Sequence, residues 1–209
     1  ELLDETASKG HGFLSDVCQK WENEIITAKE LGIRTVAFRL GMVLGHDGGA
    51  LNKMLPPFKL GVGGRLGSGS QWMSWIHIND LVNMMIHAIE NPSMDGVFNA
   101  VSPTPVRNSE FTKTLGRLLK RPTIFPVPGF VLKIGLGELS ELLLSSQRVN
   151  SKKISNTGFQ FEYPKLEEAL KEVCGHSYHE IKLEQWVPQP KSRTFSFFKE
   201  ARNLEKITP

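Results

Sequence analysis

The stretch "GSGSQWMSWIHINDL", residues 67–81, brings several chemically capable side chains close together. Trp72 and Trp75 could stack on a flat or apolar ligand, and the imidazole of His77 could transfer protons near neutral pH. We favour the structural alternatives: Trp75 in a strand core, Trp72 at a junction between lobes, and His77 as a hydrogen-bonded core residue. Asp80 is expected to cap the helix that follows. The stretch therefore predicts the wall of a pocket, without the group that performs the chemistry.

Cysteine is the second residue type that could do chemistry. Cys18 and Cys174 are the only cysteines among the 209 residues, and they form no C-x-x-C pair. Neither a disulfide framework nor a zinc site is expected, no other metal site is predicted, and the composition fits a reducing compartment. Cys18 is a candidate nucleophile, but its helix offers no adjacent base. We therefore favour a small buried apolar role for it.

Alternating helices and strands have to position these residues. Apolar side chains at helical spacing predict a helix over residues 12–31, and "RTVAFRLGMVLG" predicts a strand directly after it. "WIHI" and "GVFNAVS" predict two further strands, followed by helices at 80–91 and from Asn108 onward. This alternation is typical of an α/β fold with a parallel sheet.

The composition limits the classes of function. The chain is 40% hydrophobic and 22% charged, as in ordinary globular proteins, and its formal net charge is +3. Lys and Arg form no dense block, so nucleic-acid binding is not expected. The chain contains no apolar run of about eighteen residues, so no transmembrane segment is expected. We expect an intracellular, reducing compartment, either the cytoplasm or the matrix of a mitochondrion or plastid.

Four ordered segments resemble one protein family: "FRLGMVLG", "GGALNKMLPPFKLGVGGRLGSGSQWMSWIHINDL", "GVFNAVSPTPVRNSEF" and "GFQFEYPKLEEAL". They are similar to the atypical "epimerase family protein" branch of the NAD-dependent epimerase/dehydratase-like proteins, in the extended short-chain dehydrogenase/reductase superfamily. The resemblance covers roughly residues 1–174. It implies the second half of a Rossmann-type parallel sheet over 1–106, a small mixed substrate-side lobe over 107–174, and an extended interaction tail over 175–209.

The Gly-rich phosphate turn of such folds is not found in this sequence. A pyrophosphate loop requires the order strand, glycine turn, helix. The glycines at 61, 63, 64, 67 and 69 instead follow a helix that we expect to break at Pro56 and Pro57, and they precede a strand. The resemblance therefore implies NAD or NADP binding only if a front Rossmann half is supplied. The candidate cofactor contacts within this chain are Gly41, Val43 and Leu44.

Three explanations for the missing front half stay open: it is a separate polypeptide, it belongs to the same protein upstream of Glu1, or it does not exist. We favour the first two, because half a sheet would expose an unpaired strand edge and a bare apolar face.

The resemblance also places the superfamily's Tyr-x-x-x-Lys pair on the helix at 12–31. Aligned on the "WE" of this chain, Leu14 falls at the tyrosine position and Cys18 at the lysine position. Leucine has no proton to transfer, and a thiol is not a fixed cation. Standard tyrosine-based hydride or epimerase chemistry is therefore not expected, and whether the chain is an enzyme stays open.

Further substitutions point to an apolar substrate. Met73 falls where sugar-nucleotide relatives carry a phosphate-binding arginine, and Met42 falls where they place a substrate-facing asparagine. Asn99 ends a strand that faces the cleft, where it could bind a ligand amide or serve as a turn residue. Arg39 is expected to form an ion pair beside the same edge of the sheet, with Asp80 as the candidate partner.

Two functions follow from these observations. The chain could be the substrate-side portion of an atypical NAD(P)-dependent epimerase- or oxidoreductase-like protein. Alternatively, it could be a non-catalytic accessory subunit that keeps the fold within a larger assembly. The second hypothesis draws on the lost Tyr and Lys positions and on the aromatic, basic tail 175–209, which could pack along a partner protein.

Overall fold

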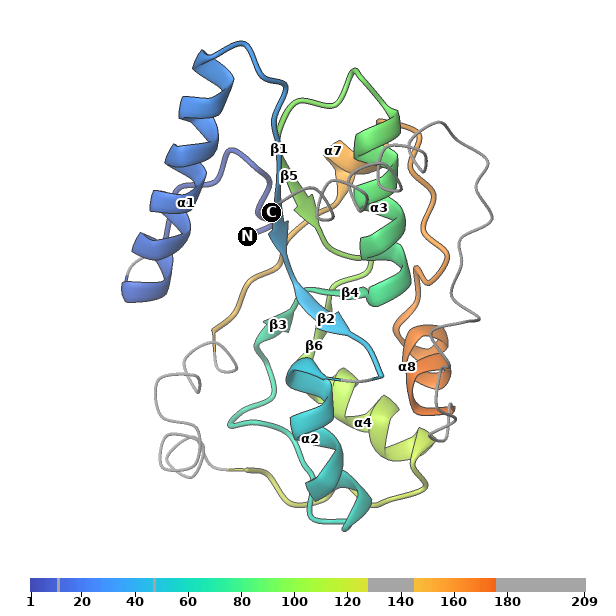
Figure 1. Ribbon diagram of the computed structural model, residues 1–209. Helices are drawn as coiled ribbons and strands as arrows, with labels where there is room; N and C mark the ends of the chain where they lie inside the picture. Colours follow the sequence, from blue (N-terminus) through green and yellow to red (C-terminus); the bar gives the residue numbers. More distant parts are fainter. Residues whose placement is uncertain (11, 47, 128–144, 176–209) are drawn as a thin grey trace, which may run out of the picture. The chain divides into compact units, whose positions relative to one another are not determined.

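The computed structural model describes residues 1–10, 12–46, 48–127 and 145–175 (Figure 1). These residues lie within one compact unit, Glu1–His176. The helices described are α1 (Phe13–Glu30), α2 (Gly49–Lys59), α3 (Ile78–Glu90), α4 (Asn108–Leu118), α7 (Lys152–Ser155) and α8 (Leu166–Gly175). The strands described are β1 (Val36–Leu40), β2 (Met42–Leu44), β3 (Trp72–Met73), β4 (Trp75–His77), β5 (Gly96–Ala100) and β6 (Val106–Arg107). The predicted tail, apart from Gly175, lies outside the described residues.

The strands pair in three short ladders. β1 lies parallel to β5, β2 lies parallel to β4, and β3 lies antiparallel to β6. The parallel pairs are joined through helices, as expected when a strand must return in the same direction. The predicted α/β fold with parallel strands is confirmed.

The run predicted as one strand is two strands that meet at Gly41. The N–H of Gly41 donates to the carbonyl of Ala100 on β5, and the N–H of Met42 donates to the carbonyl of Ser74, beside β4. A Cβ at Gly41 would lie 2.8 Å from the Ser74 oxygen and 2.9 Å from Cγ1 of Val101. Glycine therefore allows the chain to pass close to Ser74 while it changes pairing partner.

The expected break at Pro56 and Pro57 is wrong. α2 runs through both prolines to Lys59. Pro lacks an N–H but keeps its carbonyl, and both carbonyls are used: Pro56 accepts from Leu60, and Pro57 accepts from Val62. Phe58, which is buried, anchors this end of the helix in the core. Packing of α2 thus outweighs the two lost helical hydrogen bonds.

The core has two clusters of buried side chains. One joins α2, β4, α4 and α8, and contains Leu44, Leu51, Phe58, Met73, Trp75, Val106, Phe111, Leu115, Leu166, Ala169, Leu170 and Val173. The other joins α3, β5 and α7, and contains Ile76, Leu81, Met84, Ala88, Met94, Phe98, Ala100, Ile154 and Phe159. β4 contributes to both, because the successive residues Trp75 and Ile76 point to opposite faces of the strand.

The outer edge of β5 is covered by side chains. The N–H of Asn99 donates to the Glu5 carboxylate at 2.8 Å, and the Lys153 ammonium donates to the carbonyl of Val97 at 2.6 Å. Both backbone groups face away from β1. Glu5 and Lys153 therefore occupy one outward backbone group each, on Asn99 and Val97, and so hinder pairing with another strand at this edge.

The opposite edge, on β1, differs. Thr35 and Gly41, at the two ends of β1, form backbone hydrogen bonds with β5. Along a parallel strand, every second residue bonds to a given neighbour. The N–H groups of Val36, Phe38 and Leu40 therefore face away from β5. Within the described ranges, no strand or side chain accepts from these N–H groups. The side chain of Leu40 is also 55% exposed. The sheet therefore has one closed edge and one open edge.

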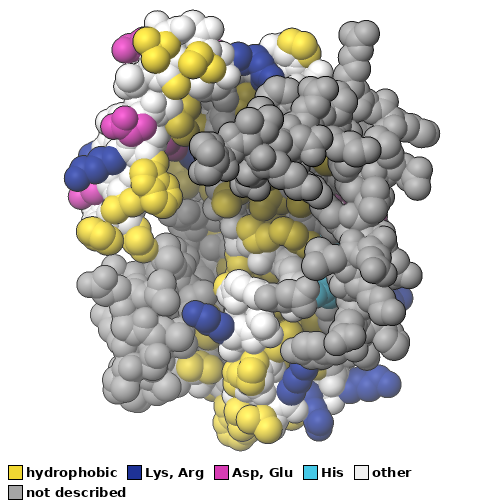
Figure 2. Space-filling model, viewed as in Figure 1, with side chains coloured by type: hydrophobic (Ala, Val, Ile, Leu, Met, Phe, Trp, Pro, Cys, Tyr) yellow, Lys and Arg dark blue, Asp and Glu magenta, His cyan; other side chains and the backbone are white. Residues whose placement is uncertain are grey.

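Helix α1 is amphipathic but has no fully buried side chain among those described. Phe13, Trp21 and Leu14 are exposed, Trp21 by 68%. Figure 2 shows hydrophobic side chains along this helix, in the upper left of the view. An apolar helical face of this kind usually packs against another element. Among the described helices, none is long and apolar enough to cross a membrane.

Candidate functional site

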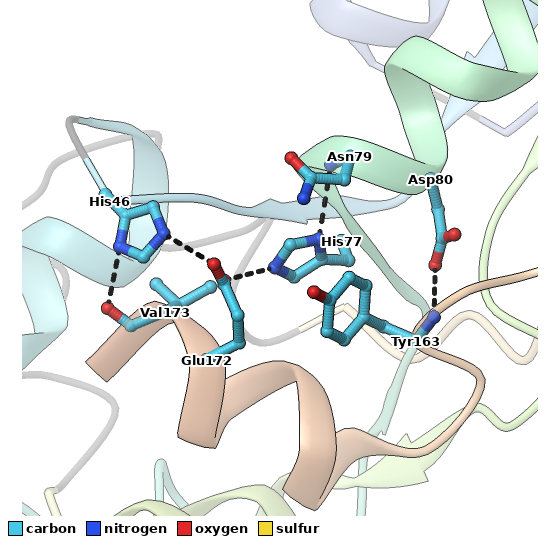
Figure 3. Close-up of polar contacts among 7 residues, drawn as sticks. All are labelled: His46, His77, Asn79, Asp80, Tyr163, Glu172 and Val173. Carbon is cyan, nitrogen blue, oxygen red and sulfur yellow. Dashed lines mark hydrogen bonds and ion pairs between the residues drawn. The ribbon is translucent and has the colours of Figure 1, made fainter. Parts of the chain in front are cut away.

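His77 lies at the end of β4, where the chain enters α3 (Figure 3). Its side chain is completely buried. Nδ1 accepts a hydrogen bond from the N–H of Asn79 at 3.2 Å, which makes His77 the N-cap of α3. Because Nδ1 accepts, the ring proton belongs on Nε2, which donates to Oε2 of Glu172 at 2.8 Å. Both ring nitrogens are therefore engaged with protein groups.

The other oxygen of Glu172 contacts a second histidine. His46 follows β2, and its Nε2 lies 3.2 Å from Oε1 of Glu172, while its Nδ1 lies 2.9 Å from the carbonyl of Val173. Both nitrogens of His46 therefore face acceptors. Burial acts to raise the pKa of Glu172, but the hydrogen bonds from His77 and His46 outweigh it, and the net pKa lies below its ordinary value.

The prediction that Asp80 caps α3 is wrong. Asp80 lies inside the first turn of α3, and its buried carboxylate accepts from the N–H groups of Glu162 at 2.7 Å and Tyr163 at 3.0 Å. Burial raises the pKa of Asp80 above its ordinary value, although these two hydrogen bonds act in the opposite direction. The ring of Tyr163 lies over that of His77, with centroids 3.9 Å apart.

The predicted ion pair between Arg39 and Asp80 is also wrong. The guanidinium of Arg39 binds both carboxylate oxygens of Glu22 on α1, at 2.7 and 2.8 Å, and donates to the carbonyl of Glu5. The hydrogen bond from Arg39 lowers the pKa of Glu22. This forked pair connects α1 to β1, whereas Asp80 connects α3 to the segment before α8.

The contacts of Glu172 and Asp80 therefore form a clamp, which we call the His77 clamp: His46, His77, Asp80, Tyr163 and Glu172. It fastens α8 to the carboxyl ends of β2 and β4, where open parallel sheets commonly bind ligands. Within the described ranges, no group of three or more His, Cys, Asp or Glu residues could hold a metal ion. The arrangement holds α8 in place, and both ring nitrogens of His77 are already engaged with protein groups.

The predicted pocket residues are brought together along β3, β4 and their partners. Met42 pairs with Trp75 across the β2–β4 ladder, and Leu44 pairs with His77. Trp75 is fully buried, and its indole N–H donates to the carbonyl of Thr104 at 2.9 Å. These contacts agree with the core interpretation of Trp75.

Trp72 and Met73 lie on β3. The guanidinium of Arg107 lies 4.0 Å from the Trp72 ring centroid, and that of Arg148 lies 4.4 Å from it, so two cations already flank the ring. Met73 is buried, and its sulfur lies 3.3 Å from Nδ2 of Asn108. No described contact tests a ligand-binding role for Trp72 or Met73, so both roles stay predictions.

The remaining candidates are spread over the sheet and α1. Asn99 is buried on β5, where its Nδ2 donates to the carbonyl of Asn150. Leu14 and Cys18 lie four residues apart on α1, and both are exposed. The expectation of a buried apolar Cys18 therefore does not hold within this chain. No described contact joins Cys18 to His77.

Sequence reasoning missed the residues that engage His77. Glu172 lies 95 positions after His77 and, in the sequence, looks like an ordinary surface glutamate of an amphipathic helix. His46 follows a strand in a glycine-rich turn, and Tyr163 precedes a proline. The one available signal was the position of His46 and His77 directly after predicted strands, since the ends of parallel strands meet at one edge of a sheet.

Comparisons with known protein families agree with this geometry. Residues 15–101 match the family described as "NAD dependent epimerase/dehydratase family", and residues 127–173 match a domain of unknown function, DUF1731. Over residues 15–101, the chain is therefore similar to the NAD dependent epimerase/dehydratase family. The predicted resemblance to its C-terminal portion is confirmed.

Relatives from this epimerase family include "Epimerase family protein SDR39U1 homolog, chloroplastic" of Arabidopsis thaliana. It is 43% identical over 172 residues, which are 82% of this chain and 49% of that protein. A relative from Mycobacterium leprae is 40% identical and matches over 81% of this chain and 55% of its own length. The chain thus spans about half the length of these relatives.

The solved structure of human epimerase family protein SDR39U1 (isoform 2) with NADPH is similar to this chain. It aligns with a TM-score of 0.78 at 38% identity, over 85% of this chain and 60% of that one. A nucleoside-diphosphate sugar epimerase of Corynebacterium glutamicum aligns with a TM-score of 0.64 at 28% identity, over 43% of its own length. These likenesses confirm the Rossmann-type epimerase fold.

Proposed function

We propose that this chain is the substrate-side portion of an NAD(P)-binding epimerase-family protein, and that the open edge of β1 receives a strand from another segment. The observation that carries the proposal is the contrast between the two edges of the β1–β5 pair. Glu5 and Lys153 cover the outer edge of β5, whereas the outward N–H groups of β1 have no acceptor among the described residues. A sheet blocked at one edge only is suited to continue at the other.

The exposed face of α1 supports the same proposal. In doubly wound folds, helices pack on the faces of the sheet. α1 is fastened to β1 by the Arg39–Glu22 pair, yet Phe13 and Trp21 are exposed. A preceding segment that extended the sheet beyond β1 would offer these side chains an apolar surface.

The described residues do not form a dinucleotide cradle by themselves. Leu44 is fully buried, whereas Gly41 and Val43 keep partial exposure, and the Ser74 backbone and Val101 occupy the space beside Gly41. NAD(P) binding therefore depends on the added segment. The NADPH bound in the human relative's structure supports NADPH as the first cofactor to test.

The chemistry of the completed protein does not follow the tyrosine-based route. Leu14 and Cys18 occupy the positions aligned with its Tyr and Lys, and neither side chain can replace them. We keep the hypothesis of an apolar substrate, which rests on Met42 and Met73. The alternative, a non-catalytic accessory subunit that keeps the fold, is retained because of the same two substitutions, and an assembly partner for the tail 175–209 stays a prediction.

The compartment is inferred from the thiols and from one relative. Both Cys18 and Cys174 are free, which fits a reducing environment. One relative's name places that protein in the chloroplast. We propose a reducing compartment for this chain, either the cytoplasm or an organelle matrix.

A fluorescence titration with NADPH tests the proposal on two polypeptides: the 209-residue chain alone, and the chain with the segment that precedes Glu1 or with its co-purifying partner. We expect a saturable response only from the second. Leu40→Pro provides a sharp variant, because it removes an outward N–H of β1 and spares the ladder with β5. Leu40→Ala removes the same exposed side chain and keeps that N–H.

The proposal predicts that Leu40→Pro weakens NADPH binding and Leu40→Ala does not. Binding by the extended protein without substrate turnover would favour the accessory subunit. No NADPH response from the extended protein, or equal responses from both polypeptides, would contradict the proposed function.

A further inference from the structure

Two loops, one after α2 and one after α4, carry exposed apolar side chains. Leu60 and Val62 follow α2, and Ile124 and Phe125 follow α4. All four side chains are more than half exposed, Phe125 by 68%. We call these four residues the loop patch. Single exposed apolar residues need no explanation, but a group of them on a protein surface usually marks a site of association.

Backbone contacts hold the two loops side by side. The N–H of Val127 donates to the carbonyl of Arg65 at 2.8 Å, and the N–H of Gly67 donates to the carbonyl of Val127 at 2.9 Å. A Cβ at Gly64 would overlap the carbonyl oxygen of Phe125. Glycine therefore allows the loop after α2 to lie directly against the backbone of the loop after α4, so the loop patch is one surface.

The charges around the loop patch have one sign. The exposed cations that border it along the chain are Lys59, Arg65, Lys120 and Arg121. None of them takes part in an ion pair among the described residues. The sequence contains no Asp or Glu over residues 48–79 or 111–137. In the lower part of Figure 2, hydrophobic side chains lie beside Lys and Arg side chains, with no Asp or Glu visible there.

One of these cations is kept at a backbone cost. Among the described residues, Lys120 is the only non-glycine residue with a positive φ, at 53°. It follows the C-cap of α4, a position where glycine is common because the left-handed conformation strains other residues. The chain therefore places a lysine beside the loop patch where the local geometry favours glycine.

We propose that the loop patch docks on an anionic lipid surface. Its apolar side chains enter the headgroup region, and the four cations bind the negatively charged headgroups. A second copy of the chain fits this surface less well, because it would bring the same positive charges face to face. The inference is independent of the proposed function, since it uses no residue of α1 or of the β1 edge.

Sedimentation of the 209-residue chain with lipid vesicles tests the proposal. One set of vesicles contains equal parts of phosphatidylcholine and phosphatidylserine, and the other contains phosphatidylcholine alone. We expect binding to the anionic vesicles to be tighter by about tenfold or more and to weaken with added salt, which screens the charges. No binding to the anionic vesicles, or equal affinity for both sets, would overturn the proposal.

Variants of Phe125 test the apolar contribution. Phe125→Ser should weaken binding to anionic vesicles about tenfold, because the side chain no longer enters the headgroup region. Phe125→Trp should retain binding, since tryptophan suits the membrane interface. Trp21→Ser is the matched control: Trp21 lies on α1, is also 68% exposed, and should not affect binding. Equal weakening by Trp21→Ser would mean that α1 binds the vesicles, and would overturn the proposal.

Lys120→Gly separates binding from stability. It removes one cation and relieves the strained φ, so vesicle binding should weaken about fivefold while the melting temperature stays the same or rises. Lys20→Ala, at an exposed position on α1, should leave binding unchanged. The second-copy alternative has its own result: a dimer in sedimentation velocity that Phe125→Ser dissociates, without vesicle binding. That result, or unchanged binding by Lys120→Gly, would contradict the proposal.

Discussion

Glu172 accepts a hydrogen bond from Nε2 of His77 at 2.8 Å, and this contact joins α8 to the end of β4. Its other carboxylate oxygen contacts His46, which follows β2. One glutamate therefore fastens α8 to two neighbouring parallel strands. Because His77 is fully buried, loss of this carboxylate would leave its Nε2–H without an acceptor.

The substitution Glu172→Gln tests the clamp. It keeps the shape of the side chain but removes its charge, and an amide cannot accept from both histidines. We expect the free energy of unfolding in urea to fall by about 1–3 kcal/mol. Glu168→Gln is the matched control on the same helix: Glu168 is exposed and, among the described residues, forms an ion pair with exposed Lys165, so little change is expected. An equal loss of unfolding free energy in the two variants would contradict a stabilising role of the His77 clamp.

The stability of the wild type relative to Glu172→Gln has a defined pH dependence. The pKa of Glu172 in the folded protein lies below its ordinary value of 4.5, because the hydrogen bonds from the histidines outweigh burial. A lowered carboxyl pKa stabilises the fold above the unfolded-state value, and this contribution is lost as the pH falls through the folded-state value. The stability difference between wild type and variant should therefore narrow as the pH falls below the ordinary value. A difference that widens there would have the wrong sign.

Asp80→Ala should also destabilise the protein. It removes the acceptor for the N–H groups of Glu162 and Tyr163 at a buried position in the first turn of α3. The expected loss is about 1–3 kcal/mol, measured by thermal and urea unfolding. Asp16→Ala, an exposed aspartate of α1 that lies 3.7 Å from Lys9, should change little. If Asp80→Ala unfolds like wild type, the segment before α8 is not held by this carboxylate.

Gly41→Ala should be costly for steric reasons. The new methyl group would lie 2.8 Å from the Ser74 carbonyl oxygen, within the junction of β1 and β2. Overpacking of this kind costs about 1–3 kcal/mol. Gly10→Ala is the control, because its methyl group would meet only the Ser15 hydroxyl, at 3.8 Å. Comparable urea midpoints for the two variants would mean that the junction has room for a side chain.

The two cysteines should react at different rates with a thiol reagent such as DTNB. Cys18 is exposed, whereas burial raises the pKa of Cys174 and reduces its reactive thiolate. We expect one fast and one slow thiol, with the fast phase absent in Cys18→Ser. In the extended protein the fast phase should slow, since α1 becomes covered. A fast phase that survives Cys18→Ser would contradict this assignment.

The sequence was sufficient for the fold class and for most of the longer elements, but not for the two-residue strands β3 and β6. Helical spacing placed α1 within one residue at each end, and β-rich runs located β1, β4 and β5, because these patterns report directly on local backbone geometry. It failed where a tertiary contact decides the outcome. The glycine at position 41 looks like any strand residue until the approach of Ser74 is seen. The prolines at 56 and 57 look like a break until Phe58 is found in the core.

The candidate site was harder to predict than the fold. The polar character of His77 and Asp80 was evident, but their partners lie 95 and 82 or more positions away, and no local rule selects them. Arg39 was correctly expected to form an ion pair, but with the wrong acid. Glu22 lies 17 positions before it, on a helix whose orientation over the sheet the sequence does not specify.

The central claim is that the outer edge of β1 is open. Amide hydrogen exchange along β1, measured by NMR for each residue, tests this claim most directly. In the isolated 209-residue chain, the amides of Ala37 and Arg39 should exchange slowly because they face β5, whereas those of Val36, Phe38 and Leu40 should exchange fast. In the protein extended by its preceding segment, all five should exchange slowly. If Val36, Phe38 and Leu40 are already as slow as Ala37 and Arg39 in the isolated chain, the edge is not open and the account is wrong.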